Sequence, residues 1–281
     1  MRGEARARAT ARLREMDDPT ASLDADLLLA HVCGISREQL YAHLDVPLDP
    51  AQQRDLDELV ERRGEGEPIA YLRGFKEFFG LRFVVDHRVL IPRPETEVLV
   101  EAAIAYLDAT ERTRVVDVGT GSGAIAVAIA VHQPRVRIVA TDVSADALEV
   151  AALNAAAHGL AGRIDLRLGD LLDPLERPVD LVVANLPYLT ERAVDELTAE
   201  RTSLRFEPRV AVFAGPAGLD LIRRCVAQLP AKLERGGAAF FECDPPQVDP
   251  LSAMLSEALG ANTHVHLDLM GAPRVVGIIR P

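Results

Sequence analysis

The sequence predicts an α/β protein in which a small helical domain precedes a larger domain with a seven-stranded, mostly parallel sheet. In about the first 70 residues, apolar side chains recur at helical spacing. After Pro94, short apolar runs alternate with helical segments, which favours parallel strands joined by right-handed crossovers. Only residues 269–273 join the last two apolar runs, too few for a parallel crossover. The last strand is therefore expected to be antiparallel to its predecessor.

Capping signals divide the N-terminal domain, residues 1–73, into helices. An apolar helical pattern over residues 24–32 ends before Gly34, and Ser36 with Gln39 resembles a capping box. Asp49-Pro50 with Gln52 predicts another helix that runs to Arg63. The Gly-Glu-Gly-Glu-Pro stretch at 64–68 is the first clear break.

A hairpin linker is expected over residues 74–91, and within it residues 81–85 and 89–91 should be extended. The remaining residues, 92–281, form the predicted sheet domain. Its strands are expected at 114–118, 136–141, 164–168, 179–184, 237–243, 263–268 and 274–279. Ser144 should begin a helix that ends near Gly159, and another helix is expected over 220–233.

Composition limits the classes of function. The chain has 281 residues, 48% of them hydrophobic, and a formal net charge of -12, which disfavours tight nonspecific binding to nucleic acid. A protein or small-molecule partner is favoured. Cys33, Cys225 and Cys243 are widely spaced, so we expect reduced thiols rather than a disulfide framework or a zinc site. There is no signal-peptide pattern and no membrane-length apolar run, and we expect a cytoplasmic protein without membrane contact.

A glycine-rich turn follows the first strand of the predicted sheet. Gly119, Thr120, Gly121, Ser122 and Gly123 stand between that strand and a helix, where backbone can approach a ligand closely. The same run satisfies the loose dinucleotide pattern G-x-G-x-x-A, and a tight turn that only packs a helix on a strand is a further alternative.

Acidic residues follow the next two strands. Asp142 lies about 20 residues after the turn, at the offset where a carboxylate meets a ribose hydroxyl. Asp170, after the third strand, could accept a hydrogen bond from an adenine amino group, although Asp after Gly is also common in turns. The glycines alone leave NAD and S-adenosylmethionine as alternative cofactors.

The residues that follow the fourth strand distinguish between these two candidate cofactors. The strand ends at Asn185-Leu186-Pro187-Tyr188, which can hold a planar NH2 group with two oxygen acceptors and one aromatic face. A dehydrogenase needs a proton donor such as His or Lys, but no histidine ends a strand in the 114–184 region and the chain has only Lys76 and Lys232. The tetrapeptide therefore favours methyl transfer to an amide or exocyclic amine, for which no metal is needed.

The sequence also resembles the HemK/PrmC family, the protein N5-glutamine methyltransferases that act on peptide-chain release factors. The resemblance extends through nearly the whole chain and is carried by residues 68–80, by Leu-Ile-Pro-Arg-Pro-Glu-Thr-Glu at 90–97, and by Phe-Glu-Pro-Arg at 206–209. It implies a Rossmann-like class I methyltransferase domain, with an N-terminal domain that contributes to recognition of the release factor.

The resemblance also implies roles for individual residues. The turn 119–123 and Asp142 would bind S-adenosyl-L-methionine with Leu171 beside the adenine, and residues 185–188 would hold the glutamine of a Gly-Gly-Gln loop. Asn185 is expected to contact the cofactor as well. Arg93, Glu95 and Glu97 could form a lid near the cofactor, or a helix cap with solvated charges.

Two positions depart from the family pattern. The family usually has Asn-Pro-Pro-Tyr where this chain has Leu186, and Asn-Leu-Pro-Tyr is similar to the motif of ribosomal-RNA adenine dimethyltransferases. Asp244 stands where the family commonly has glycine. An adenine-N6 RNA methyltransferase and a non-catalytic binding protein on the same fold are therefore the alternative functions.

Overall fold

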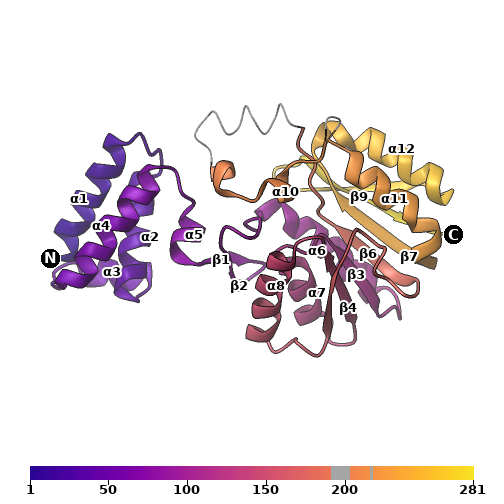
Figure 1. The fold of residues 1–281 in the computed structure, drawn as a ribbon, viewed down its shortest axis with the longest axis horizontal. Helices are drawn as coiled ribbons and strands as arrows, with labels where there is room; N and C mark the ends of the chain where they lie inside the picture. The colour runs from indigo at the N-terminus through magenta and orange to yellow at the C-terminus, as the bar shows by residue number, and fades with distance from the viewer. Residues whose placement is uncertain (191–202, 216–217) are drawn as a thin grey trace. The chain divides into compact units, whose positions relative to one another are not determined.

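The structure is a computed structural model that describes residues 1–190, 203–215 and 218–281 (Figure 1). It divides into two compact units. The first comprises Met1–Phe75 together with Leu197–Phe206, and the second comprises Lys76–Glu196 and Glu207–Pro281. Each unit has its own cluster of buried apolar side chains.

The first unit is helical, with the elements α1 (Arg2–Glu15), α2 (Ala21–Cys33), α3 (Arg37–Ala42), α4 (Pro50–Gly64), α5 (Ile69–Arg73) and the short 3-10 helix η2 (Ser203–Phe206). The predicted capping signals are confirmed: Ser36 and Asp49 form capping boxes with Gln39 and Gln52, and Gly34 ends α2 in the left-handed conformation. Leu13, Leu28, Leu29, Leu40 and Leu56 form the centre of its core.

The predicted hairpin is present, and the expected extended segment at 81–85 supplies one of its strands, but 89–91 does not supply the other. Strands β1 (Phe75–Phe78) and β2 (Leu81–Val84) pair across Phe79-Gly80, where both residues have positive φ. Residues 89–91 are not a strand. The Ile91 N–H donates instead to the buried carboxylate of Glu207, 116 positions further along the chain, and so takes no part in a strand ladder.

The second unit contains the predicted seven-stranded sheet, in the order β5-β4-β3-β6-β7-β9-β8. Its strands are β3 (Arg114–Val118), β4 (Arg137–Asp142), β5 (Ile164–Leu168), β6 (Val179–Ala184), β7 (Leu233–Glu242), β8 (Thr263–Leu267) and β9 (Pro273–Ile279). The first five are parallel, and β9 is antiparallel to both β7 and β8, between which it lies. The predicted fold class and the antiparallel last strand are confirmed.

Strand β7 begins earlier than expected, at Leu233 rather than at residue 237. Its register against β6 shifts between Val179 and Leu181, so Leu233 pairs with Val179 while Ala238 pairs with Leu181. The extra residues, Glu234 to Gly237, are accommodated at this irregularity, which a sequence pattern of alternating strands and helices does not reveal.

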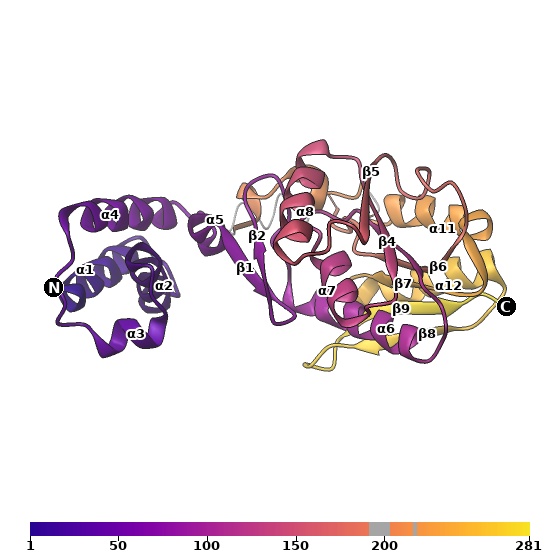
Figure 2. The ribbon, with the colours of Figure 1, turned by 90° about the horizontal axis from the view of Figure 1, so that it is seen from below.

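Helices cover both faces of the sheet. Helices α6 (Glu97–Asp108), α7 (Ala124–His132) and α8 (Ala145–Ala157) lie on one face, and α11 (Asp220–Lys232) and α12 (Val248–Leu259) lie on the other (Figures 1 and 2). Among the described residues, this unit also contains the short helices η1 (Pro94–Thr96), α10 (Arg209–Val212) and η3 (Pro245–Gln247). Parallel strands covered on both faces read as continuous apolar runs, and all six residues of β6 are buried.

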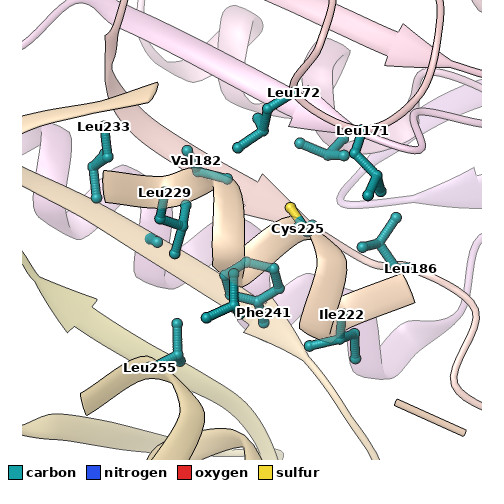
Figure 3. Packing of buried hydrophobic residues seen from close by; sticks show 14 of the residues in the cluster. Leu171, Leu172, Val182, Leu186, Ile222, Cys225, Leu229, Leu233, Phe241 and Leu255 are labelled. Atoms are coloured by element: carbon teal, nitrogen blue, oxygen red, sulfur yellow. The ribbon is translucent and has the colours of Figure 1, made fainter. Parts of the chain in front are cut away.

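An apolar cluster of this unit extends from beneath α11 and α12 to the carboxyl ends of the strands (Figure 3). Phe241, Leu229 and Leu255 lie in it, and so do Leu171 and Leu186, which come from two of the predicted site segments. The walls of the site are therefore continuous with the core, and packing fixes their positions.

Candidate active site

The glycine turn has a backbone that only glycine adopts without strain. Gly119, Gly121 and Gly123 all have φ between +54° and +79°. A Cβ at Gly123 would lie 3.2 Å from the backbone of Ala151 in α8, and one at Gly119 would lie 3.0 Å from the Leu186 side chain. A Cβ at Gly121 would meet nothing within 4 Å. Gly119 and Gly123 thus permit close packing, whereas Gly121 leaves open space.

Asp142, at the end of β4, holds this turn. Its Oδ2 accepts from the Gly121 N–H at 2.9 Å and its Oδ1 accepts from the Ser144 N–H at 2.9 Å. Burial raises the pKa of Asp142, and the bonds from these backbone groups oppose the rise. The carboxylate predicted to meet a ribose therefore also fixes the loop that precedes α8.

Asp117 lies beneath the turn and was not among the predicted site residues. It is fully buried at the end of β3, and its Oδ2 accepts from the Thr120 hydroxyl at 2.7 Å and from the Ala126 N–H at 3.2 Å. Burial raises the pKa of Asp117 to about 7. This side chain links strand, turn and helix.

The loop after β5 carries the predicted adenine-side residues. Leu171 has a φ of +49°, and its carbonyl accepts from the Thr141 hydroxyl at 2.8 Å. Asp170 forms an ion pair with Arg224 of α11. Asp170 therefore has an arginine partner already, which the sequence pattern did not indicate.

Asn185 follows β6, and a hydrogen bond to another side chain holds its amide group. Its Nδ2 donates to the hydroxyl of Thr96 at 3.0 Å. No described residue donates to its Oδ1. Thr96 is buried, and its hydroxyl lies close enough to the buried Glu242, at the end of β7, to lower the pKa of that carboxyl by hydrogen bonding. The Asn185 amide is thus tied to two other elements of the unit.

The side chains of Leu186 and Tyr188 both contact the apolar cluster of this unit, and a hydrogen bond holds the backbone at Tyr188. Leu186 is buried against the Gly119 turn, in the apolar cluster. Tyr188 packs against the same cluster, and burial raises the pKa of its hydroxyl. The Tyr188 carbonyl accepts from Gln247 Nε2 at 3.0 Å. The backbone of the tetrapeptide is therefore held from η3.

The structure gives Asp244 a clear role. Asp244 caps η3 in a capping box with Gln247 and pairs with Arg274 of β9 at 3.3 Å. Because Gln247 in turn holds the carbonyls of Tyr188 and Gly218, Asp244 acts on the tetrapeptide through Gln247.

One cavity brings most of the predicted residues together. It has a volume of about 260 Å³. The predicted residues that line it are Gly119, Gly121, Asp142, Asp170, Leu171, Asn185, Leu186 and Pro187. Thr120, Ser122, Gly123 and Tyr188 are not among its lining residues. Thr120, Ser122 and Gly123 are part of the glycine turn. Tyr188 remains a predicted substrate contact.

The cavity also includes residues that the sequence did not single out. Arg88, which pairs with Asp86 and Glu149, lines it together with Val89 and Leu90, and Arg224 lines it from α11. The signal that could have assigned residues 88–90 to the site was the 90–97 family match, which begins at Leu90. Arg224 has no comparable signal.

Arg93 and Glu97 have partners within the unit. Arg93 pairs at 2.5 Å with Glu207, a buried carboxyl whose pKa burial raises. Glu97 accepts from the Phe79 N–H at 2.7 Å. Both side chains therefore connect segments around the site.

Within residues 1–190, 203–215 and 218–281, no three His, Cys, Asp or Glu side chains are grouped as metal ligands. No helix in the described part of the chain is both long enough and apolar enough to cross a bilayer.

Solved structures share this fold. A ribosomal-protein methylase of Lactobacillus delbrueckii subsp. bulgaricus is similar over 70% of this chain and 83% of its own, with 24% identity and a TM-score of 0.50. A 16S rRNA methyltransferase of T. thermophilus, solved with AdoMet and guanosine, is similar over 74% of this chain and 50% of its own, with 17% identity and a TM-score of 0.53. The fold is that of a Rossmann-like methyltransferase.

Sequence comparisons identify the family. A model of the PrmC N-terminal domain matches residues 4–74, and a model of the methyltransferase small domain matches residues 95–203. Release factor glutamine methyltransferases of Koribacter versatilis and Xylella fastidiosa are 38% and 46% identical, over 94% and 78% of this chain and 93% and 79% of their own lengths. The chain belongs to the family of release factor glutamine methyltransferases.

Proposed function

We propose that this protein transfers a methyl group from S-adenosylmethionine to the side-chain amide nitrogen of the glutamine in the Gly-Gly-Gln loop of a peptide-chain release factor. The observation that carries the proposal is the cavity that the glycine turn, Asp142 and Asn185-Leu186-Pro187 line together. The names of the curated relatives support the same substrate.

The described residues fit the cofactor. Gly121 leaves open space at the cavity wall, and Asp142 offers a carboxylate there for ribose hydroxyl groups. Leu171 and Arg224 provide an apolar surface and a cation at the adenine side. When bound, S-adenosylmethionine supplies an electrophilic methyl group on a positively charged sulfur.

The protein's contribution to the reaction is to position a weak nucleophile. The lone pair of a carboxamide nitrogen is delocalised into its carbonyl group. Asn185 Oδ1 and the Leu186 carbonyl oxygen accept from the two protons of the substrate NH2 group, and Tyr188 covers its plane. These contacts align the nitrogen with the methyl group, and their partial negative charge stabilises the positive charge that develops on the nitrogen. The new nitrogen–carbon bond replaces the methyl–sulfur bond, the sulfur leaves as a neutral thioether, and the nitrogen releases one of its two protons to solvent.

The first unit is proposed to bind the release factor outside its Gly-Gly-Gln loop. The match of residues 4–74 to the PrmC N-terminal domain supports this role. A cytoplasmic location belongs to the same proposal, because release factors act in translation termination. We propose no direct binding of nucleic acid, in line with the formal net charge of -12.

A methyl-transfer assay tests the function directly. The full-length protein and radiolabelled S-adenosylmethionine are incubated in parallel reactions with three acceptors. These are a release factor, the same factor with its loop glutamine replaced by alanine, and ribosomal RNA. We expect the label to appear only in the release factor that keeps its loop glutamine. Label in the RNA would support the adenine-N6 alternative, and binding of release factor without transfer would support the non-catalytic alternative.

A further inference from the structure

Asn185 can hold a substrate NH2 group only if its amide is correctly oriented. An asparagine side chain has an accepting oxygen at one end and a donating NH2 group at the other. If the NH2 end faced the substrate, two donors would oppose each other. The orientation of this amide therefore decides whether the site works.

A chain of two buried side chains sets that orientation. Asn185 Nδ2 donates to Thr96 Oγ1 at 3.0 Å. Glu242 is buried beside Thr96, close enough for hydrogen bonding from the Thr96 hydroxyl to lower the pKa of its carboxyl. An ionised carboxylate can only accept, so Thr96 must give it its single proton and accept from Asn185. This leaves Asn185 Oδ1 as the end that faces away from Thr96.

We propose that Thr96 and Glu242 are positioning residues that fix the Asn185 amide with its oxygen toward the substrate, an inference that rests on the proposed function. Thr96 lies at the start of α6 and Glu242 at the end of β7. They come from 89 positions before and 57 positions after Asn185. Neither side chain is among those that line the cavity, so they act through Asn185.

The burial of Glu242 supports a role beyond stability. Glu242 is 2% exposed, and its Oε2 has no hydrogen-bond partner among the described residues. A buried carboxyl oxygen without a partner costs free energy. Such groups are concentrated at functional sites, where their charge is used.

The same arrangement makes the amide orientation depend on pH. Burial raises the pKa of Glu242 to about 7; hydrogen bonding from Thr96 and the charge of Arg274 oppose the rise, whereas Glu95 and Asp244 add to it. A protonated Glu242 can donate to Thr96, whose own proton is then free to bond Asn185 Oδ1. The orientation is no longer fixed, so turnover should rise as pH rises through about 7.

The test uses the full-length enzyme, a full-length release factor and saturating S-adenosylmethionine. We expect Thr96→Val to lower kcat by about 100-fold, with the Kd for S-adenosylmethionine from calorimetry unchanged. Thr96→Ser should restore most of the turnover. Thr110→Val is the matched control, because it removes a hydroxyl hydrogen bond to Tyr106 just beyond the other end of α6.

A double-mutant comparison separates positioning from a structural defect. Adding Thr96→Val to Asn185→Ala should cause no further loss of kcat, because the group that Thr96 orients is already absent. A Thr96→Val enzyme with wild-type kcat, or a double variant whose loss is the product of the two single losses, would overturn the inference.

Glu242→Gln provides an independent measurement if Thr96→Val does not fold. Glutamine does not titrate, so the kcat profile from about pH 6 to about pH 8 should become flat. A profile that still follows the wild type would also overturn the inference. If the wild-type enzyme transfers no methyl group to the release factor, the proposed function itself fails, and this result is distinct from the others.

Discussion

Replacing Asp117 with asparagine should change how the stability of the second unit depends on pH. The Asp117 carboxyl is fully buried beneath the glycine turn, and burial raises its pKa from 3.8 to about 7. Its Oδ2 accepts two hydrogen bonds that the oxygen of an asparagine can also accept. The substitution therefore removes the titration while it keeps the shape and these contacts.

The size of the effect follows from the two pKa values. A carboxyl whose pKa is higher in the folded state holds a proton that the unfolded chain releases, so its stability contribution is complete below about pH 4 and is lost as pH rises through about 7. Since one pKa unit corresponds to about 1.4 kcal/mol, Asp117 should cost the wild type about 3 kcal/mol of unfolding free energy between pH 5 and pH 8. Asparagine should not show this loss.

The unfolding free energy can be measured by urea titration at pH 5 and pH 8. Circular dichroism is the signal, because the chain has no tryptophan whose fluorescence could report unfolding. The Asp117→Asn protein should gain about 3 kcal/mol relative to wild type on going to the higher pH. The exposed Asp146→Asn is the control for removal of a carboxylate. An unfolding free-energy difference between Asp117→Asn and wild type that is the same at both pH values would refute the reasoning.

Three further predictions concern the site. Asp142→Asn should weaken S-adenosylmethionine binding by about 10-fold or more, because it removes the charge of the carboxylate. Asparagine keeps the size of the side chain but can accept from only one of Gly121 and Ser144, which donate to different oxygens of Asp142. Unchanged affinity in calorimetry would remove Asp142 from the site. Asn185→Ala should reduce kcat by the equivalent of about 2–4 kcal/mol with little change in cofactor affinity; turnover near that of the wild type would contradict the amide-holding mechanism. Deletion of residues 1–74 should leave cofactor binding largely intact, because the second unit has its own core, while methylation of intact release factor should fall steeply. A folded truncated protein with the full-length rate would show that the first unit does not serve recognition.

The elements that sequence analysis predicted well are those with a local cause. The helix starts at Ser36, Asp49 and Ser144 follow from side chains that cap the backbone within three residues. The strand at 179–184 was predicted exactly because a strand buried on both faces is a continuous apolar run.

The elements that it missed depend on residues far away in the chain. Residues 89–91 are apolar enough for a strand, but the Ile91 N–H bonds Glu207. The partner of Asn185 is Thr96, and that of Asp170 is Arg224, and no spacing pattern encodes either pair. The sequence thus indicated segments that line one cavity, but not the side chains that orient them.

The position of β9 has a consequence for how this protein is made. The last strand, Pro273–Ile279, lies inside the sheet and pairs with both β7 and β8. During synthesis the helices up to α5 have emerged and can pack early, since domains fold as units from the N-terminus. The sheet, in contrast, keeps two unpaired strand edges until residues 273–279 leave the ribosome. Loss of these residues should therefore expose both edges and favour aggregation over folding.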